Sequence, residues 1–460
     1  MRALIGRGLL LVLFAAGAAG AAETARSDAE SPLARFDFRQ VISGAKDKVF
    51  PAVVYIKVLQ ETHESGQKVS QEVSGSGVII SDKGEVLTNW HVVDKAVDVR
   101  CLLLDGRAMD AKIVGADKDT DLALLQLAAP AGGGPLPHAV LGDSDKLKEG
   151  DFVMAMGAPW GLSRSVSMGI IACARRFLPG ASQYSLWLQT DASISPGNSG
   201  GPLVNTEGEV IGINTRGAVV GGDIGFAVPA SIIRDIVAQI RQFGRVNWSW
   251  TGLQLQPLKD FDRNIYFEGS EGVIVAETDP ESPARRAGLQ ARDRIVKIGG
   301  KAVTAVTDED LPAVRRMIGL LPKHQKVPID LVRGDKPLTI EIEPREKGKV
   351  EGSELDCPRW DLTVREINQF DTPDLYFYRP KGVFVYGVKG PGNAELAGLR
   401  PLDIVVKIDG REVTTLDDVR AIHKEAINGL KTKHRAIFSV LRNGLLRQVV
   451  LDFSRDFSKE

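Results

Sequence analysis

The sequence predicts a mainly β protein in which two β-barrels are followed by two smaller domains of mixed α and β structure. Short apolar runs alternate with turns from Val49 to Leu127, and a second such series runs from Phe152 to Ile213. This rhythm is typical of antiparallel barrels rather than βαβ units. The rest of the chain repeats itself at an offset of 110 residues, since Gly272-Val273-Ile274-Val275 aligns with Gly382-Val383-Phe384-Val385. Two copies at this spacing indicate tandem domains rather than a solenoid.

Composition places the chain among globular proteins. Its 460 residues are enough for about three domains. The hydrophobic content of 43% and charged content of 25% are ordinary for folded protein. A net charge of -1 argues against nucleic acid or an anionic membrane as the main partner, because neither would be attracted over a long range. We see no zinc-type spacing of cysteine and histidine, and we expect no metal or organic cofactor.

The N-terminus predicts export. Arg2 and Arg7 precede the apolar run Leu9–Phe14, which is followed by small residues up to Ala21. This pattern is that of a secretory signal peptide over residues 1–21, cut after Ala21, and it predicts a periplasmic or otherwise extracytoplasmic protein. A membrane anchor needs about twenty apolar residues, so we expect no stable membrane span.

Three cysteines, Cys101, Cys173 and Cys357, cannot all pair within one chain. Cys101 and Cys173 are the only pair inside the barrel region, and an oxidising compartment would permit their disulfide. Isolated buried thiols are the interpretation that we favour, because Cys101 and Cys173 lie among apolar or strand-like neighbours.

The stretch Gly197-Asn198-Ser199-Gly200-Gly201 is the first candidate for chemistry. A serine hydroxyl needs a base to accept its proton and donors to stabilise the oxyanion. Glycines let the backbone bend tightly, so the amides of Gly197 and Ser199 can point into one small space. We assign the oxyanion hole to Gly197, Asn198 and Ser199. Alone, the stretch also fits an ordinary hairpin turn, so the prediction depends on a base and an acid upstream.

Both partners occur upstream. His91 follows the apolar hairpin that begins at Gly77, and Asp121 opens a buried strand that runs to Leu127. A carboxylate at the mouth of such a strand is suited to hold an imidazole in one tautomer. Asp117 and Asp119 are rivals for this role, but only Asp121 adjoins the strand. The order His91, Asp121, Ser199 is that of the chymotrypsin-type triad.

Three blocks carry a family resemblance: Thr88-Asn89-Trp90-His91-Val92-Val93, Asp121–Leu127 and Gly197–Leu203. They resemble the catalytic blocks of the HtrA/DegP family of serine proteases, and the likeness covers nearly all of the chain after the signal region. The resemblance implies a chymotrypsin-like double β-barrel over residues 49–244, with the triad in the cleft between the barrels. It also implies that the loop Arg175–Tyr184 orders the oxyanion hole.

Specificity can be predicted in part. The residue six positions before the nucleophile lies at the base of the pocket in chymotrypsin-like folds, where an aspartate would select Arg or Lys. Here it is Ser193, so we expect cleavage after small or medium apolar residues. The resemblance adds Asn214 and Thr215 to the pocket. Because Asn198 cannot form the ion pair of a trypsin-like zymogen, activation should not require cleavage of a propeptide.

Residues 22–48 begin polar and become amphipathic, with Phe36 and Phe38 among charges. In the HtrA/DegP family the corresponding segment joins protomers into trimers, so the resemblance implies a homo-oligomer. A helix folded back on its own domain is an equally good interpretation. Further on, apolar residues at helical spacing predict a helix over Ser231–Ile240, with Ser231 as its N-cap and Gly244 at its end.

The two repeats resemble PDZ domains, over residues 250–346 and 357–455, with a charged linker at 347–356. A PDZ domain adds a peptide as a strand to a sheet edge and holds its terminal carboxylate with backbone amides. Trp250, Thr251, Gly252 and Leu253 match that carboxylate-binding loop. The second copy has Trp360-Asp361-Leu362-Thr363, which lacks the glycine and gains a negative charge, so packing or assembly is at least as good an interpretation there.

Together these features predict an ATP-independent serine endopeptidase for unfolded or misfolded exported proteins, with PDZ domains that take C-terminal peptides. Two alternatives remain open at this stage. One is a peptide-sensing or chaperone-like binding protein with little proteolysis, and the other is a signalling protease with one narrow substrate.

Overall fold

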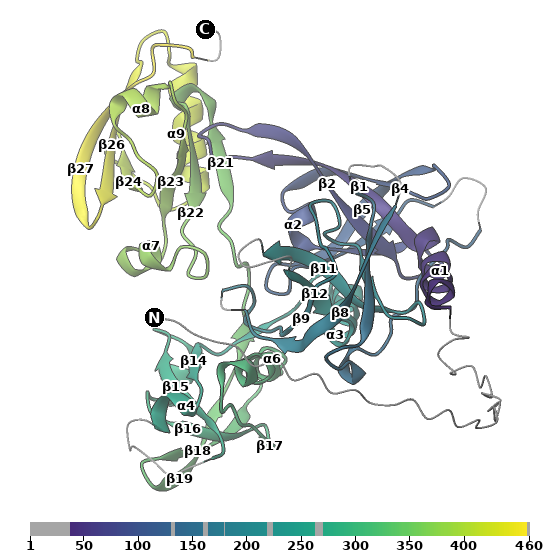
Figure 1. Cartoon of the computed structure of the whole chain (residues 1–460). Coiled ribbons are helices and arrows are strands. Elements are labelled where there is room, and N and C mark those ends of the chain that lie inside the picture. The colour runs from purple at the N-terminus through teal and green to yellow at the C-terminus, as the bar shows by residue number, and fades with distance from the viewer. Residues whose placement is uncertain are drawn as a thin grey trace, which may run out of the picture.

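The computed structural model describes residues 37–129, 134–159, 164–178, 180–218, 224–262 and 270–457. The predicted signal peptide and the segment up to residue 36 lie outside this part of the chain. Two barrels form one body, and each repeat forms a separate lobe beside it (Figure 1). Within the described residues no helix combines the length and apolarity that a membrane crossing requires.

The first barrel closes in the order β1-β2-β3-β6-β5-β4. Its strand β6 is buried at nearly every position, because β3 and β5 pair with its two edges and α3 covers it from outside. The strands are β1 (Val53–Thr62), β2 (Val69–Ile79), β3 (Glu85–Thr88), β4 (Ala96–Leu102), β5 (Ala108–Asp117) and β6 (Leu122–Leu127).

The second barrel closes in the order β10-β11-β12-β9-β8-β7. A compact cluster of small and branched apolar residues fills it, with Val153, Ile171 and Leu203 fully buried. The strands are β7 (Phe152–Gly157), β8 (Ser165–Arg176), β9 (Trp187–Thr190), β10 (Pro202–Val204), β11 (Val210–Ala218) and β12 (Ile224–Pro229).

Helix α3 (Ala230–Phe243) packs its apolar face on the barrels, and Gly244 ends it in the left-handed conformation. Ser231 is not the N-cap that we expected. Pro229 occupies that position, and Ser231 lies inside the first turn, where its amide donates to the Ser144 hydroxyl at 3.0 Å.

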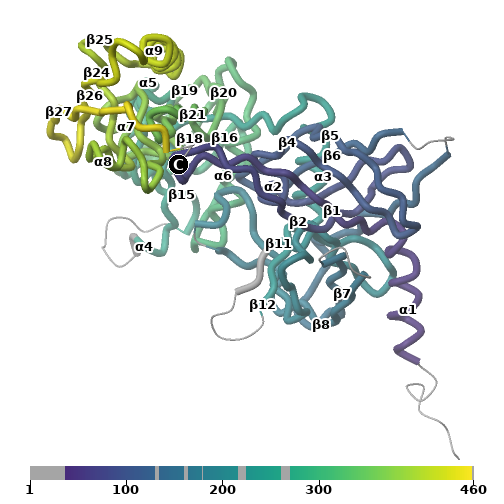
Figure 2. Tube along the Cα trace, turned by 90° about the horizontal axis from the view of Figure 1, so that it is seen from above, coloured from purple at the N-terminus to yellow at the C-terminus, as the bar shows by residue number. Residues whose placement is uncertain are grey.

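Helix α1 (Phe38–Val49) folds back on its own barrels. Ala45 and Val49 are buried in the core, and the Phe38 ring lies 4.9 Å from that of Phe152 on β7. In both views of the chain α1 lies on the side of the barrels away from the two repeats (Figures 1 and 2).

The first repeat forms a sheet in the order β14-β15-β16-β18-β19, so β14 is an edge strand. Helix α6 lies beside it, and the short β13 (Ser249–Trp250) pairs with β20 (Arg345–Glu346). The other elements are β14 (Leu253–Gln256), α4 (Lys259–Asp262), β15 (Val273–Thr278), α5 (Pro283–Ala287), β16 (Arg294–Ile298), β17 (Lys301–Ala302), α6 (Leu311–Gly319), β18 (Val327–Arg333) and β19 (Lys336–Ile342).

The sheet of the second repeat has the order β21-β22-β23-β24-β26-β27, with one strand more than the main sheet of the first repeat. The additional strand β21 (Glu354–Cys357) begins inside the expected linker and pairs antiparallel with β22 (Leu362–Glu366). The other elements are α7 (Pro373–Tyr378), β23 (Val383–Val388), α8 (Asn393–Ala397), β24 (Ile404–Ile408), β25 (Arg411–Glu412), α9 (Leu416–Asn428), β26 (Arg435–Arg442) and β27 (Leu445–Asp452).

Each repeat contains the same internal Arg–Asp ion pair, which we call the Arg–Asp clasp. In the first, Arg333 on β18 binds both carboxylate oxygens of Asp293 at 2.7 Å. In the second, Arg442 on β26 binds Asp403 in the same bidentate way at 2.6 Å. Both aspartates are buried, so the sequence repeat corresponds to a repeated structure.

The polar segment between Gln60 and Ser74 is largely β-structure rather than a loop. β1 and β2 pair as far as Thr62 and Val69, and this hairpin reaches out to the second repeat (Figure 1). At its tip the carbonyl of His63 accepts a hydrogen bond from the Thr363 hydroxyl.

Cys101, Cys173 and Cys357 are all free, and burial raises the pKa of Cys101 to about 12.

Candidate active site

Three separate connections bring His91, Asp121 and Ser199 together. His91 lies on the short helix α2 (Trp90–Val93), directly after β3. Asp121 lies in the turn between β5 and β6, and Ser199 lies in the glycine turn that precedes β10. Because the two barrels supply different members, the site lies where they meet.

His91 and Asp121 are in direct contact. His91 Nδ1 is 2.9 Å from each Asp121 carboxylate oxygen, and the His91 backbone amide donates to Oδ1 at 3.1 Å. The Asp121 side chain is 6% exposed and that of His91 is 41% exposed. This arrangement buries the acid and leaves the imidazole open to a substrate.

Asp121 is held in a backbone conformation that side chains rarely adopt. Its φ is +56°, in the left-handed region. Asn89 Nδ2 donates to the Asp121 carbonyl at 3.0 Å, and the Thr215 hydroxyl donates to the carboxylate. Since such strain persists only where the surroundings hold it, these contacts fix the direction of the carboxylate. Asp117 and Asp119 have other partners within the described residues and do not contact His91.

The Ser199 hydroxyl is turned towards β11. It donates to the Thr215 carbonyl at 2.9 Å, and among the described residues no hydrogen bond joins it to His91. Catalytic hydrogen bonds are often unformed without substrate, so this orientation does not exclude Ser199 as the nucleophile.

The turn around Ser199 is fixed by Ser76, a residue that the sequence did not single out. Ser76 Oγ donates to the Gly197 carbonyl at 2.6 Å and accepts from the Ala158 amide at 2.8 Å. The Ser76 amide donates to the Ser199 carbonyl at 2.8 Å. Gly75 and Gly77 on either side of Ser76 are a signal for close backbone approach inside a strand, and that signal could have found it.

The amides of Gly197 and Ser199 have no hydrogen-bond acceptor among the described residues, as an oxyanion hole requires. Asn198 differs from our expectation, because its amide is engaged by the Ser195 carbonyl at 2.9 Å. Its buried side chain lies against Gly157, where an added Cβ would come within 2.4 Å of Oδ1. Asn198 therefore shapes the turn instead of donating to an oxyanion.

The expected pocket residues are only partly together. Ser193 is exposed, and its carbonyl accepts from the Ser167 hydroxyl at 2.7 Å. Asn214 is fully buried, and its amide nitrogen donates to the Pro202 carbonyl at 3.1 Å, so its side chain belongs to the barrel interior. The Thr215 side chain points to Asp121. The side chains of Asn214 and Thr215 therefore both satisfy buried partners, and the assignment of Ser193, Asn214 and Thr215 to the pocket stays a prediction.

A separate pocket of about 420 Å³ lies between the first repeat, the second repeat and the loop at Gln183 and Tyr184. Trp250, Thr251, Gly252 and Leu253 all line it, together with residues of α6 across the groove. Gly252 has a φ of +72°, and an added Cβ would lie 2.1 Å from the Cβ of Ser282. The predicted carboxylate-binding loop thus opens onto a groove between an edge strand and a helix.

Family models match two parts of this chain. A trypsin-like peptidase domain matches residues 75–213, and a PDZ domain matches residues 274–333. A probable periplasmic serine endoprotease, DegP-like, of Marinomonas sp. is 34% identical over 82% of this chain and 79% of its own length. The periplasmic serine endoprotease DegP of Salmonella typhimurium is 33% identical over 78% of this chain and 73% of its own length.

The chain belongs to the DegP-like family of periplasmic serine endoproteases. Like other members, this DegP-like protein is a serine endopeptidase and is periplasmic. Among solved structures, the HtrA-type protease AlgW with a decapeptide is 30% identical with a TM-score of 0.58, over 67% of this chain and 99% of that one. The expected double barrel followed by PDZ domains is confirmed. Within the described residues no three metal-type ligands cluster.

Proposed function

We propose that this DegP-like protease degrades unfolded or misfolded exported proteins, with Ser199, His91 and Asp121 as its catalytic triad. The observation that carries the proposal is the paired contact of His91 Nδ1 with the buried Asp121 carboxylate, beside a glycine turn with two free amides. That contact fixes the tautomer in which His91 Nε2 can accept a proton.

In the proposed reaction, the Ser199 hydroxyl turns from Thr215 towards His91 and attacks the peptide carbonyl. His91 accepts the hydroxyl proton and then donates it to the leaving amine, while Asp121 holds the ring and stabilises its charge. The amides of Gly197 and Ser199 stabilise the oxyanion. Water then repeats the cycle on the acyl-enzyme and releases the second product.

An unfolded chain is the substrate class that suits this site. Cleavage requires an extended segment that can enter between the barrels, and a folded protein does not present one. Ser193 brings no charge to the pocket, which supports cleavage after small or medium apolar residues. The division of the chain at 49–244, 250–346, 347–356 and 357–455 remains our proposal.

The first PDZ domain is the proposed site for C-terminal peptides, because among the described residues β14 is an edge strand and its residues line one pocket with those of α6. In the second domain β21 already pairs with the corresponding strand β22 and packs against α9. Its loop is also occupied, since the buried Asp361 carboxylate accepts from the Asn393 amide at 2.9 Å. We therefore assign peptide binding to the first domain and an assembly or packing role to the second.

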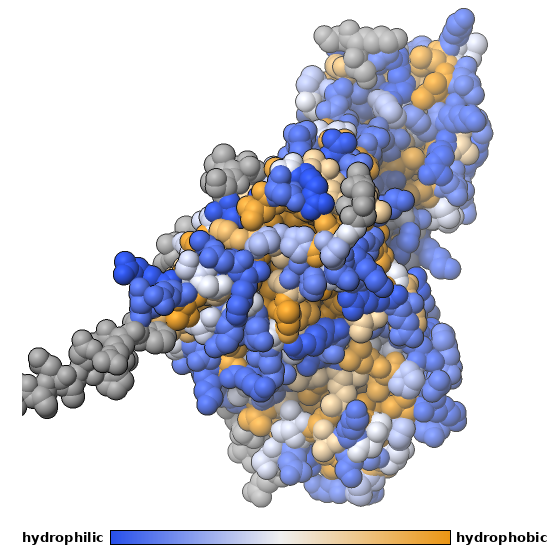
Figure 3. Space-filling view, turned by 90° about the vertical axis from the view of Figure 1, so that its right-hand side faces the viewer, coloured by the Kyte–Doolittle hydropathy of each residue, from blue (hydrophilic) through white to orange (hydrophobic). Residues whose placement is uncertain are grey.

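We also propose a homo-oligomer, a trimer or a multiple of trimers. Phe152 and Met168 lie exposed on the neighbouring strands β7 and β8, and Phe152 contacts Phe38 of α1. Apolar surface is also visible on the face of the molecule drawn in Figure 3. Light scattering on the mature protein tests this proposal, because a monomer at micromolar concentration would contradict it.

A peptide-sensing protein with little proteolysis is the second candidate, and the orientation of Ser199 towards Thr215 favours it as a resting state. The test compares cleavage of unfolded casein by the mature protein and by its Ser199→Ala variant. We expect the variant to lose turnover by several orders of magnitude, while folded protein is spared by both. Absence of cleavage by the wild type, even with C-terminal peptides present, would favour the sensing role. Cleavage of one sequence alone would favour the narrow signalling protease.

A further inference from the structure

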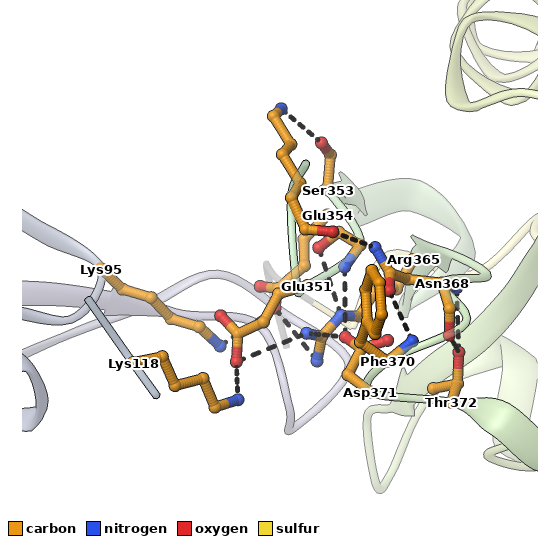
Figure 4. Close-up of polar contacts among 12 residues, drawn as sticks. Lys95, Lys118, Glu351, Ser353, Glu354, Arg365, Asn368, Phe370, Asp371 and Thr372 are labelled. Atoms are coloured by element: carbon orange, nitrogen blue, oxygen red, sulfur yellow. Dashed lines mark hydrogen bonds and ion pairs between the residues drawn. The ribbon is translucent and has the colours of Figure 1, made fainter. Parts of the chain in front are cut away.

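A short segment, residues 347–354, runs from the first PDZ domain to the second along the protease barrel. Three of its side chains form ion pairs with that barrel. Lys347 Nζ lies 2.7 Å from Asp119, Glu351 pairs with Lys118, and Glu354 lies 3.0 Å from Lys95 Nζ. Figure 4 shows Glu351 and Glu354 facing the two lysines, with Arg365 behind them. We call residues 347–354 the interdomain strap.

The partners of the strap on the barrel adjoin the His–Asp pair. Lys95 follows the helix that carries His91, and Lys118 and Asp119 belong to the turn that ends at Asp121. The Lys118 ammonium also lies 5.1 Å from the centre of the Trp90 ring, next to His91. The strap therefore forms ion pairs with the two chain segments that position His91 and Asp121.

The pair between Lys347 and Asp119 is the most enclosed of the three. The Lys347 side chain is 8% exposed and that of Asp119 is 18% exposed. The ammonium also lies over the rings of Tyr184 and Phe370, at 5.1 and 5.3 Å from their centres. Burial lowers the pKa of Lys347, but Tyr184 and Asp119 outweigh this effect and raise it overall. Removing one partner of such a desolvated pair leaves the other charge poorly compensated.

The turn from Asp117 to Asp121 depends on support from outside the barrel. Asp117 accepts hydrogen bonds from the Thr120 amide at 3.0 Å and from Trp248 Nε1 at 2.9 Å. Trp248 comes just before the first PDZ domain and stacks on Tyr184, with the ring centres 4.2 Å apart. Thus Trp248, just before the first PDZ domain, and Lys347, just after it, both bind carboxylates of the turn 117–121.

We propose that Lys347 is a positioning residue for the endopeptidase reaction. Its ion pair with Asp119 holds the turn whose last residue, Asp121, keeps a left-handed backbone and a carboxylate aimed at His91. Without the pair the turn relaxes, and the His91 ring loses its fixed orientation. This inference rests on the proposed role of Asp121 as the triad acid.

The test uses the full mature protein and a short chromogenic peptide that does not need the PDZ domains. We expect Lys347→Met to lower kcat roughly ten- to hundredfold, because small misplacement of a catalytic group has effects of that size. KM should stay close to wild type, while the melting temperature should fall because Asp119 loses its partner. Lys347→Arg keeps a positive charge within reach of Asp119 and should restore most of kcat. Lys326→Met, which removes an exposed pair with Glu341, is the matched control and should have no effect.

Wild-type kcat in Lys347→Met would overturn the proposal, and so would a loss that Lys347→Arg fails to restore. If Lys347→Met does not fold, Asp119→Asn removes the same pair from the barrel side with an amide of equal shape and decides the question. Asp121→Asn is measured in parallel. Retained activity in Asp121→Asn would refute the triad assignment, whereas its loss beside an unaffected Lys347→Met would refute the strap alone.

Discussion

The role of Ser76 gives the sharpest prediction. Replacing it by alanine removes one hydroxyl that serves two backbone groups, the Gly197 carbonyl at 2.6 Å and the Ala158 amide at 2.8 Å. Ser76 is fully buried, so no water replaces the lost partner. A buried polar group left unsatisfied costs about 1–3 kcal/mol, so the two groups together should lower the free energy of unfolding by about 2–6 kcal/mol.

Catalysis should suffer as well, because the Gly197 carbonyl belongs to the turn that directs the oxyanion donors. Loss of one such donor costs roughly 100- to 1,000-fold in kcat, and a displaced donor should cost less, about 10- to 100-fold. Peptide hydrolysis, corrected for active-site concentration, measures kcat, and urea unfolding in a Ser199→Ala background measures stability without self-digestion. Ser74→Ala, an exposed serine on the same strand, is the control. A Ser76→Ala enzyme that is less stable but has wild-type kcat would refute the reasoning.

Thr215→Val should lower kcat roughly tenfold, because the Asp121 carboxylate loses a buried donor, while Thr215→Ser should stay near wild type; equal rates in both variants would contradict this. Burial raises the pKa of Asp117 to about 6 from its ordinary 3.8, so the folded protein holds a proton that the unfolded chain releases. That stabilisation is complete below pH 3.8 and is lost as the pH rises through 6. Asp117→Asn should therefore flatten the urea-derived stability profile in this range, and an unchanged slope would exclude Asp117 as its source. Gly252→Ala places a Cβ 2.1 Å from Ser282, so fluorescence anisotropy should show peptide binding lost while cleavage of short substrates persists; undiminished binding would argue against the carboxylate-binding loop.

Local sequence signals predicted much of the fold and the main chemical groups. The alternation of apolar runs and turns indicated barrels, and the offset of 110 residues indicated paired domains, because both patterns record which residues face a core. The adjacency of Asp121 to a buried strand distinguished it from Asp117 and Asp119. Of these three aspartates, Asp121 is the one that contacts His91.

What the sequence could not predict depends on contacts between distant segments. Ser76 lies far from Ser199 in the chain, and Lys347 lies 228 positions from Asp119. The side-chain directions of the expected pocket residues have the same cause. A buried polar side chain such as Asn214 or Thr215 turns to whichever partner the fold brings near, and no local pattern states that direction.

The repeated Arg–Asp clasp has a practical consequence. Each PDZ domain contains the same internal ion pair, Arg333 with Asp293 in the first and Arg442 with Asp403 in the second. The two domains nevertheless differ at the sheet edge where a ligand would bind. The second domain is therefore an internal reference for the first, with the same means of folding and its groove already filled. In hydrogen exchange of the intact chain, a bound peptide should slow exchange in one copy while the other reports any change in conditions. Exchange in the second domain thus provides the reference against which peptide binding to the first domain is measured.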